Sequence, residues 1–363
     1  MESIYSRLAH HLFALGMGYP AREGLEEILK ENFTPLEAEV ALALPNDLIP
    51  LQVVGVDDII DRVNLSREQL VSILDSLSQR GLIFSAKTPK GEKGYALLQR
   101  DYGFPQSWFW KGEKTPFVKK MSDLLDKYDR GTPLQQSYGK SKTPSSQFIP
   151  VNRAVSHELQ AVYSYTMLEK VIEGAGKIAA AHCPCRIRSQ LRGKGCNHLL
   201  EVCLKFDELA EYLIEREVAR EVTKEEALRI LKQAEEDGLV HFVDNALGNI
   251  KSNCNCCGCC CWALGPIKRR RVPRDAMMAT YFIRETDESE CIGCGDCITV
   301  CPVDALTMGD DFPVADDKWC VGCGLCVLKC TTSAARLRRK SEEMPPRDFT
   351  ELHQKIREEK GLK

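Results

Sequence analysis

Two cysteine runs in the last third of the sequence decide the fold of that region: Cys291-x2-Cys294-x2-Cys297-x3-Cys301-Pro302 and Cys320-x2-Cys323-x2-Cys326-x3-Cys330-Thr331. In each run, three cysteines spaced two residues apart can surround one corner of a cube of iron and sulfide. The fourth lies too far round to join them and reaches the other cube. Glycines at 293, 295, 322 and 324 fit this arrangement, because the backbone must pass close to sulfide and donate N–H groups to it.

The segment from Phe282 to Ala335 resembles the bacterial two-cluster ferredoxin. The resemblance implies a ferredoxin-like βαβ-type fold that transfers single electrons through two [4Fe–4S] clusters. The implied ligands of the first cluster are Cys291, Cys294, Cys297 and Cys330, and those of the second are Cys320, Cys323, Cys326 and Cys301. Threonine in place of proline after Cys330 departs from the ferredoxin pattern and puts the local turn in question. Cys-x2-Cys pairs also bind zinc, but two complete runs in tandem favour iron and sulfide.

Composition limits the class of protein. The chain has 363 residues, 44% of them hydrophobic and 28% charged, which is typical of a globular protein with two or three domains. No apolar stretch approaches the roughly twenty residues that cross a bilayer, and the first residues lack a secretory signal. Eighteen cysteines in such a chain indicate metal in a reducing compartment and not disulfides. We therefore expect a cytoplasmic protein of an anaerobe.

Residues 1–100 predict helices followed by a hairpin. Thr34 caps one helix, a second is expected over 56–60, and a third opens at Ser66 and ends at Gly81. Residues 82–85 and 94–98 are expected to form strands on either side of a turn. This order resembles a winged helix–turn–helix domain, a fold that binds DNA or docks other proteins.

The next fifty residues, 101–150, predict an aromatic segment followed by a linker. The aromatic rings over 102–111 are expected to pack the first domain against the next region of the chain, and 131–150 is expected to be a loop. The tail, 341–363, is charged and predicts a short helix without an assignable role.

The middle region, 151–275, predicts a cysteine-rich α/β domain. Helices are expected over 156–173, 207–220 and 223–236, and strands over 176–181 and 239–243. The ten cysteines outside the two runs all lie here: Cys183, Cys185, Cys196, Cys203, Cys254, Cys256, Cys257, Cys259, Cys260 and Cys261. Six of the ten fall within eight residues, a density that buried structural thiols do not reach. A further iron–sulfur cluster, a structural zinc and a redox thiol relay stay open.

Other residues near these cysteines are candidates for supporting roles. His182 is the best placed of three nearby histidines to bind metal or to donate to sulfur, although a histidine satisfied by the backbone is the commoner case. Arg186 and Arg188 could supply positive charge to an anionic cluster. The His-Cys-x-Cys-Arg and Cys-Asn-Cys-Cys-x-Cys-Cys elements before a two-cluster tail resemble a group of ferredoxin-like proteins of anaerobic bacteria. That resemblance implies metal in the middle region and names no reaction.

Three functions are consistent with this organisation. The first is electron transfer through the two tail clusters, and through a middle metal site, to a partner oxidoreductase. The second is a redox-sensing transcription regulator with a DNA-binding winged helix. Residues 1–100 carry ten basic and fourteen acidic side chains, which disfavours DNA as a partner. The third is a reductase whose chemistry takes place at the middle metal, because no nucleotide-binding or hydrolase motif is present.

Two basic stretches flank the ferredoxin-like segment, 268–274 and 336–340. They predict either a solvated face or a docking patch for an acidic redox partner protein. The sequence as a whole predicts an α+β, multidomain iron–sulfur protein. Its domains are expected at 1–100 (winged-helix-like), 151–275 (metal-binding) and 276–340 (two-cluster ferredoxin).

Overall fold

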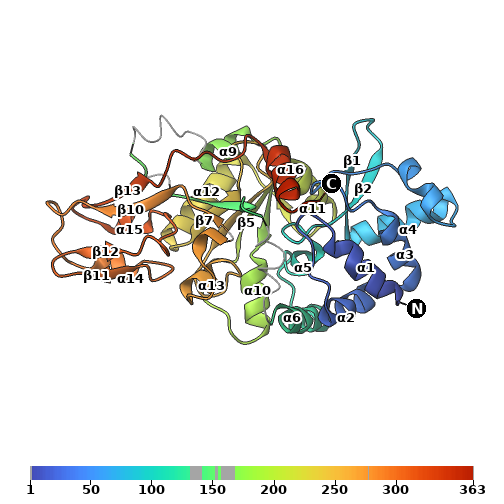
Figure 1. The fold of residues 1–363 in the computed structure, drawn as a ribbon, viewed down its shortest axis with the longest axis horizontal. Helices are drawn as coiled ribbons and strands as arrows, with labels where there is room; N and C mark the ends of the chain where they lie inside the picture. The colour runs from blue at the N-terminus through green and yellow to red at the C-terminus, as the bar shows by residue number, and fades with distance from the viewer. Residues whose placement is uncertain (1, 131–140, 152–153, 157–167, 277, 363) are drawn as a thin grey trace.

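The computed structural model describes all residues except 1, 131–140, 152–153, 157–167, 277 and 363. A helical N-terminal part lies at one end of the molecule, a seven-stranded sheet occupies the middle, and a small ferredoxin-like part lies at the other end (Figure 1). The predicted α+β class is confirmed. No helix among the described residues is both long and apolar enough to cross a membrane.

The N-terminal part consists of helices and one hairpin. Its elements are α1 (Ile4–Phe13), α2 (Glu23–Asn32), α3 (Pro35–Ala43), η1 (Val56–Asp58), η2 (Ile60–Arg62), α4 (Arg67–Gln79), β1 (Ile83–Lys87), β2 (Lys93–Leu97), α5 (Phe104–Ser107) and α6 (Pro116–Asp129). Reciprocal capping bonds at Thr34 and Ser66 start α3 and α4, as predicted. The single helix expected over 56–60 is instead two 3₁₀ turns, because Val56 and Ile59 are buried at the spacing of three residues that this tighter helix aligns.

The order of α3, the 3₁₀ turns, α4 and the hairpin is the predicted one, and the winged-helix assignment stays a prediction. α4 buries Leu70, Leu74 and Leu77 against the same core as α1 and α2. The core continues into α6, whose Val118, Met121, Leu125 and Tyr128 belong to it. The N-terminal body therefore extends beyond residue 100.

The aromatic segment joins the N-terminal part to the middle part, as predicted. Tyr102 and Trp110 lie in a core that also contains Phe84 of the hairpin and Tyr212 of the middle part. The hydroxyl of Tyr212 donates to the carbonyl of Ile83 at 2.7 Å. These buried rings leave little freedom between the two parts.

The middle part is built on a seven-stranded sheet in the order β6-β4-β5-β8-β7-β3-β9. All neighbouring strands are antiparallel except β3 and β9. The strands are β3 (Ser146–Ile149), β4 (Ile178–His182), β5 (Glu201–Phe206), β6 (Arg220–Glu221), β7 (Val240–Asp244), β8 (Ser252–Cys256) and β9 (Met278–Ala279). The helices are α9 (Leu168–Gly174), α10 (Pro184–Leu191), α11 (Asp207–Glu215), α12 (Lys224–Glu236), α13 (Leu264–Lys268) and the turn η5 (Arg274–Ala276).

The predicted strands β4 and β7 and the helices α11 and α12 are confirmed, with α11 ending five residues earlier than expected. Most of the helix expected over 156–173 lies outside the described residues, and its last part is α9. Residues 131–140 of the predicted linker also lie outside them, and β3 occupies 146–149 where a loop was expected. β3 is a strand because Phe148 and Ile149 pack into the cores on either side of the sheet.

The C-terminal part consists of two small antiparallel pairs of strands and two short helices. They are β10 (Phe282–Thr286), α14 (Asp296–Thr299), β11 (Leu306–Met308), β12 (Pro313–Ala315), α15 (Leu325–Lys329) and β13 (Ala335–Arg339). β10 pairs with β13 and β11 pairs with β12, so the first and last strands close the unit. The backbone bonds Asp287 N–H to Ala334 and Asp316 N–H to Ala305 relate the two halves as equivalents 29 residues apart.

The tail helix α16 (Phe349–Glu359) packs against both the N-terminal and the middle part and holds them together, a role that the sequence does not reveal. It folds back over the junction between the N-terminal and middle parts (Figure 1). Leu352 and Ile356 enter the core that contains Met17 and the sheet, and the ring of Phe349 lies 5.6 Å from that of Tyr102. Lys360 donates to the carbonyl of Gly16 at 2.7 Å. Three distant stretches of chain are thus held by one helix.

His353 on α16 predicts a fall in stability at acidic pH. Its side chain is 1% exposed, and burial lowers its pKa to about 3. The folded protein holds this ring neutral, so stability is complete above the unfolded pKa of about 6.5 and is lost as pH falls. Between pH 7 and 5.5 we expect His353 to cost roughly 1 kcal/mol of unfolding free energy. Urea unfolding of wild type and His353→Gln at both pH values measures this difference, and equal pH dependence of the two proteins would contradict it.

Candidate metal centres

The two cysteine runs of the C-terminal part adopt the same backbone conformation twice. Gly293 and Gly322 have φ of 67° and 63°, and Gly295 and Gly324 have φ of 77° and 78°. These left-handed conformations favour glycine, and they turn the chain sharply before α14 and α15. The glycines of both runs thus serve the same purpose, which is to curve the backbone around the thiols.

The predicted second set of cysteines lines one small cavity. Cys301, Cys320, Cys323 and Cys326 surround a space of about 20 Å³ whose wall also includes Arg284. The structure therefore brings the fourth cysteine of the first run to the first three of the second run, which is the crossed grouping that the resemblance implies. Ligation by these residues stays a prediction.

Threonine after Cys330 leaves the local turn intact. The amide of Ala335 donates to the Cys330 sulfur at 3.4 Å, and the amide of Ala305 donates to the Cys301 sulfur at 3.2 Å. Asp304 and Ser333, three residues after the two cysteines, both have positive φ. Both turns thus direct a backbone amide at the cysteine sulfur, from four residues after Cys301 and from five residues after Cys330.

Arg284 is a buried cation between the two predicted cluster sites. Its Nη2 lies 3.9 Å from the Cys297 sulfur, and its Nη1 donates to the carbonyl of Pro313 at 2.9 Å. Burial raises the pKa of Cys297 and of Cys326, and the guanidinium of Arg284 opposes this in both. Arg284 therefore favours negative charge on thiols from both runs.

The ten middle cysteines fall into two sets. The first, here called the six-thiol set, is joined by a chain of thiol–thiol hydrogen bonds and contains, in order, Cys203, Cys254, Cys256, Cys261, Cys185 and Cys183. The second, here called the four-thiol set, contains Cys196, Cys257, Cys259 and Cys260. All ten predicted residues therefore lie in thiol clusters.

Sheet pairing assembles the six-thiol set. Cys203 on β5 and Cys254 on β8 are directly opposite each other, and Cys183 follows the end of the neighbouring strand β4. Cys185 lies in the first turn of α10, and Cys261 lies in the turn before α13. Residues up to 78 positions apart thus meet at one end of three adjacent strands.

The four-thiol set joins two loops. Cys196 lies between α10 and β5, whereas the other three members follow β8. The Cys196 sulfur is 3.9 Å from that of Cys257 and 3.5 Å from that of Cys260. All four sulfurs lie within 4.8 Å of one another.

Neighbouring thiols push one another's pKa values apart. A hydrogen bond from Cys260 lowers the pKa of Cys257 to about 3, and one from Cys185 lowers that of Cys261 to about 5. Cys203 lowers the pKa of Cys254 well below the usual range, and the pKa of Cys203 itself rises because it donates. Both sets therefore contain thiols that lose their protons readily, as metal ligands must.

Two buried cations flank these thiols. Arg186 is 0% exposed and faces Cys183, Cys256 and Cys257, whose charges raise its pKa against the opposing effect of burial. Lys205 is 1% exposed, and Cys203 and Cys254 raise its pKa in the same way. A buried cation is stable only when negative charge lies beside it. The predicted charge of Arg186 near the site is confirmed, and Lys205 was missed because a single lysine within a strand gives no signal.

The three histidines lie near the thiols without joining them. The Nδ1 of His182 donates to the carbonyl of Trp110 at 3.3 Å, which is the commoner role weighed for it. His198 pairs with Asp237 at 3.1 Å. His241 is buried and bonds Asn255 at 2.5 Å. The side chains that approach these sulfurs include cations, other thiols and the hydroxyl of Ser189.

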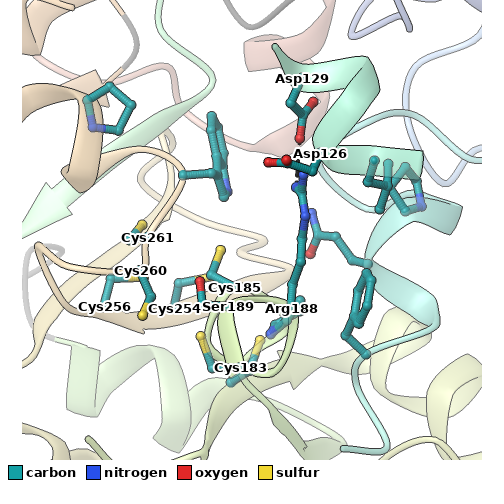
Figure 2. A pocket seen from close by; sticks show the side chains of 18 of the residues that line it. Asp126, Asp129, Cys183, Cys185, Arg188, Ser189, Cys254, Cys256, Cys260 and Cys261 are labelled. Carbon is teal, nitrogen blue, oxygen red and sulfur yellow. Dashed lines mark hydrogen bonds and ion pairs between the residues drawn. The ribbon is translucent and has the colours of Figure 1, made fainter. Parts of the chain in front are cut away.

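A cavity of about 660 Å³ opens beside the six-thiol set. All six of its thiols line the cavity, together with Cys260. Figure 2 shows thiols on one side and Asp126 and Asp129 of α6 across from them. The volume is within the range of small-molecule sites.

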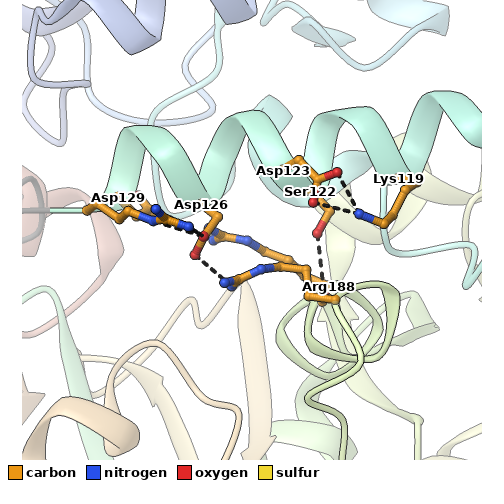
Figure 3. Close-up of polar contacts among 8 residues, drawn as sticks. Lys119, Ser122, Asp123, Asp126, Asp129 and Arg188 are labelled. Carbon is orange, nitrogen blue, oxygen red and sulfur yellow. Dashed lines mark hydrogen bonds and ion pairs between the residues drawn. The ribbon is translucent and has the colours of Figure 1, made fainter.

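The far wall of this cavity carries a network of arginines and carboxylates. Arg188 of α10 pairs with Asp129 at 2.6 Å (Figure 3). Arg192 pairs with Asp126 at 2.6 Å. Arg100 also pairs with Asp129, at 2.7 Å. The arginines lining the cavity outnumber the carboxylates; they are Arg100, Arg130, Arg188, Arg192, Arg269 and Arg271. The cavity therefore carries net positive charge.

The first basic stretch holds the ferredoxin-like part in place. Lys268 pairs with Asp304 at 3.2 Å, and Arg270 donates to the carbonyls of Val303 and Asp304. Arg274 is buried and donates to the carbonyl of Asp317 at 2.6 Å. Lys268, Arg270 and Arg274 thus join the two parts, whereas Arg269 and Arg271 are exposed. In the second stretch Arg336 pairs with Asp287, Arg338 with Glu285 and Lys340 with Asp275, so nearby acids balance most of its charge.

Three basic residues at α4 and in the hairpin are paired with acids. Arg67 pairs with Asp57, Arg80 with Glu37, and Lys93 with Asp75. This pairing reduces the positive charge available for phosphates. Protein docking stays the better prediction for the N-terminal part.

Comparison with known proteins supports the iron–sulfur interpretation of the C-terminal part. The family model of the 4Fe-4S binding domain matches residues 285–307, which contain the whole first cysteine run. No curated protein and no solved structure matches the chain. The chain is therefore an iron–sulfur protein with a [4Fe–4S]-binding segment, as the sequence predicted.

The buried charge of Lys205 leads us to predict that the middle thiols bind metal as thiolates, in an anionic centre. Lys205→Met keeps much of the side-chain volume and removes the charge that faces Cys203 and Cys254. We expect the anaerobically purified variant to lose metal from the middle part. We also expect it to lose about 3–5 kcal/mol of unfolding free energy, because the buried carboxyl of Asp244 and the neighbouring thiolates lose their counter-charge. Metal analysis and urea unfolding measure both effects. Lys232→Met, at an exposed position on α12, is the control; unchanged metal content in Lys205→Met would contradict the prediction.

Proposed function

We propose that this protein transfers single electrons from two [4Fe–4S] clusters in its C-terminal part to a metal centre held by the six-thiol set. The proposed cluster ligands are the crossed sets of cysteines described above. When bound, such clusters accept and release one electron at a time. The residues of the chain fix their positions, their charge environment and the path between them.

The observation that carries the proposal is a shared core. Cys320 and Cys323 of the C-terminal part lie in the same apolar cluster as Cys256 and Cys261 of the six-thiol set. Cys301 packs against this cluster as well. Thiols from both parts are thus embedded in one continuous packed interior.

A backbone contact shortens the path further. Gly258 lies against Pro302, which follows Cys301, so closely that a Cβ at 258 would overlap the Pro302 carbonyl oxygen. Cys257 and Cys259 adjoin this glycine in the chain. The amide of Val151 also donates to the carbonyl of Cys323 at 3.0 Å. The two parts therefore meet at residues next to thiols.

Charge favours placing electrons in the middle part. Arg186 and Lys205 lie beside the six-thiol set with almost no solvent exposure. Buried positive charge stabilises an added electron and so raises the reduction potential of a nearby centre. Arg284 has the corresponding position beside the C-terminal thiols. Partner proteins would supply or remove electrons at the exposed side, where Cys294 reaches the surface.

A second candidate function is reduction of a small anion at the six-thiol centre. The cavity beside these thiols supports it, because the cavity is large and carries net positive charge. An electron carrier does not need such a space, whereas a reductase needs room for its substrate next to the metal. The distinguishing feature is whether a small anion can reach the middle centre.

Gly258→Ala tests the proposed path. The added methyl group must push Pro302 away, at a cost of about 1–3 kcal/mol of unfolding free energy. We expect electron transfer from the C-terminal clusters to the middle centre to slow, while iron content stays unchanged. Rapid-freeze electron paramagnetic resonance after mixing with a reductant follows both centres separately.

The matched control for this variant is Gly174→Ala, where an added methyl group meets no atom within 4 Å. Its transfer rate should equal that of the wild type. If Gly258→Ala is destabilised but its electron-transfer rate equals that of Gly174→Ala, the proposed electron path is wrong.

Azide tests the second candidate. If the cavity gives access to the middle centre, azide added to the anaerobic protein changes the spectrum of that centre and leaves the C-terminal clusters unaffected. Arg188→Gln, which removes one cavity charge, should weaken azide binding by about tenfold, the equivalent of 1.4 kcal/mol. An unchanged spectrum at saturating azide would exclude an open site and leave electron transfer as the whole function.

A further inference from the structure

The four-thiol set differs from the other thiols of this protein in its compactness. Among the described residues, it is the one group of three or more candidate ligands whose ligand atoms all lie within 4.8 Å of one another. We propose that Cys196, Cys257, Cys259 and Cys260 bind one zinc ion as a closed structural site, separate from the six-thiol centre.

The sulfur–sulfur distances match a single metal ion. Four thiolates at the usual zinc–sulfur distance of about 2.3 Å form a tetrahedron with edges of roughly 3.8 Å. The two distances from the Cys196 sulfur are 3.9 Å to Cys257 and 3.5 Å to Cys260. A cluster of several irons needs its thiolates further apart, because each thiolate binds a different corner. The four-thiol set is too tight for a cube.

The donor set favours zinc over other metals. Four thiolates in a tetrahedron suit zinc or iron, and for one and the same site divalent zinc binds more tightly than divalent iron. Four protein ligands leave no open position, which is typical of structural zinc. The site also joins two loops that are distant in the chain, one after α10 and one after β8.

Neighbouring groups support the thiolates. The guanidinium of Arg186 donates to Cys257, and the hydroxyl of Ser189 donates to Cys260. Arg186 is held in turn by the carbonyl of Asn255, at 2.8 Å from its Nη2. Bonds of this kind orient the ligands of a metal and offset the charge of a tetrathiolate.

The position of the site indicates its purpose. Gly258, which packs against Pro302 of the C-terminal part, lies between two of the four ligands. Zinc has no redox chemistry, so it would fix this turn without accepting electrons. The site therefore holds the surface on which the ferredoxin-like part rests. This inference does not depend on electron transfer, because a zinc site would hold the junction whatever the function.

Substitution of Cys259 tests the proposal, because this ligand is exposed and the fold tolerates changes there best. Full-length protein is purified anaerobically, its zinc and iron are measured, and the zinc X-ray absorption spectrum is recorded. We expect one zinc per chain with four sulfur neighbours at about 2.3 Å. Cys259→Ser should lose the zinc and keep all the iron. Cys259→His should keep the zinc, because Cys₃His sites are common.

Cys183→Ser is the matched control in the six-thiol set, and it should keep its zinc and lose iron. Wild-type protein without zinc, or with zinc bound by light atoms instead of four sulfurs, would overturn the proposal. So would loss of iron and retention of zinc in Cys259→Ser. Electron transfer could fail in every variant without affecting these readouts, so the two proposals are tested separately.

Discussion

The structure depends on the compensation of buried charge by sulfur. Arg186 and Lys205 have almost no exposed surface, and the groups around them are mainly thiols. In an apolar interior a lone cation is far too costly to keep, so negative charge must lie beside these two residues, on the thiols and, for Lys205, also on the buried carboxyl of Asp244. Thiols become stable anions in such a place when they bind metal. In the proposed function the middle part is thus organised around anionic metal–sulfur sites, with two buried cations beside them.

The same principle extends to the C-terminal part and to the joint between the two. Arg284 lies beside thiols of both cysteine runs. Arg270 and Lys268 bind the loop after Cys301 through a hydrogen bond and an ion pair. Basic side chains that look like a surface patch in the sequence thus hold the middle and C-terminal parts together. In the proposed function the packed core shared by the two sets of thiols gives electrons a short route, and the cavity beside the six-thiol set leaves room for a ligand at its end.

The sequence predicts best where the relevant residues are neighbours in the chain. The spacing of the cysteine runs predicts an iron–sulfur segment, and the capping residues Thr34 and Ser66 predict where α3 and α4 begin. The division of the middle cysteines into six and four could not be predicted, because it depends on the pairing of Cys203 with Cys254 across two strands. The separation of Cys260 from Cys261, adjacent in the chain, likewise depends on the turn that directs them to different sets. The sequence also does not predict what α16 packs against, because an amphipathic pattern predicts that one face of a helix is buried but not which residues cover it.

The return of α16 to the start of the chain has a consequence for assembly. Lys360 bonds Gly16 across 344 positions, and Phe349 completes a core shared by the N-terminal hairpin and β5. Contacts between such distant segments form late and slowly, because a long loop must close first. The protein should thus fold as one cooperative unit. A fragment that ends before α16 would expose the apolar core residues Tyr102 and Trp110, which Phe349 covers in the full chain. The three parts resemble separate modules in sequence, yet they are interdependent in folding.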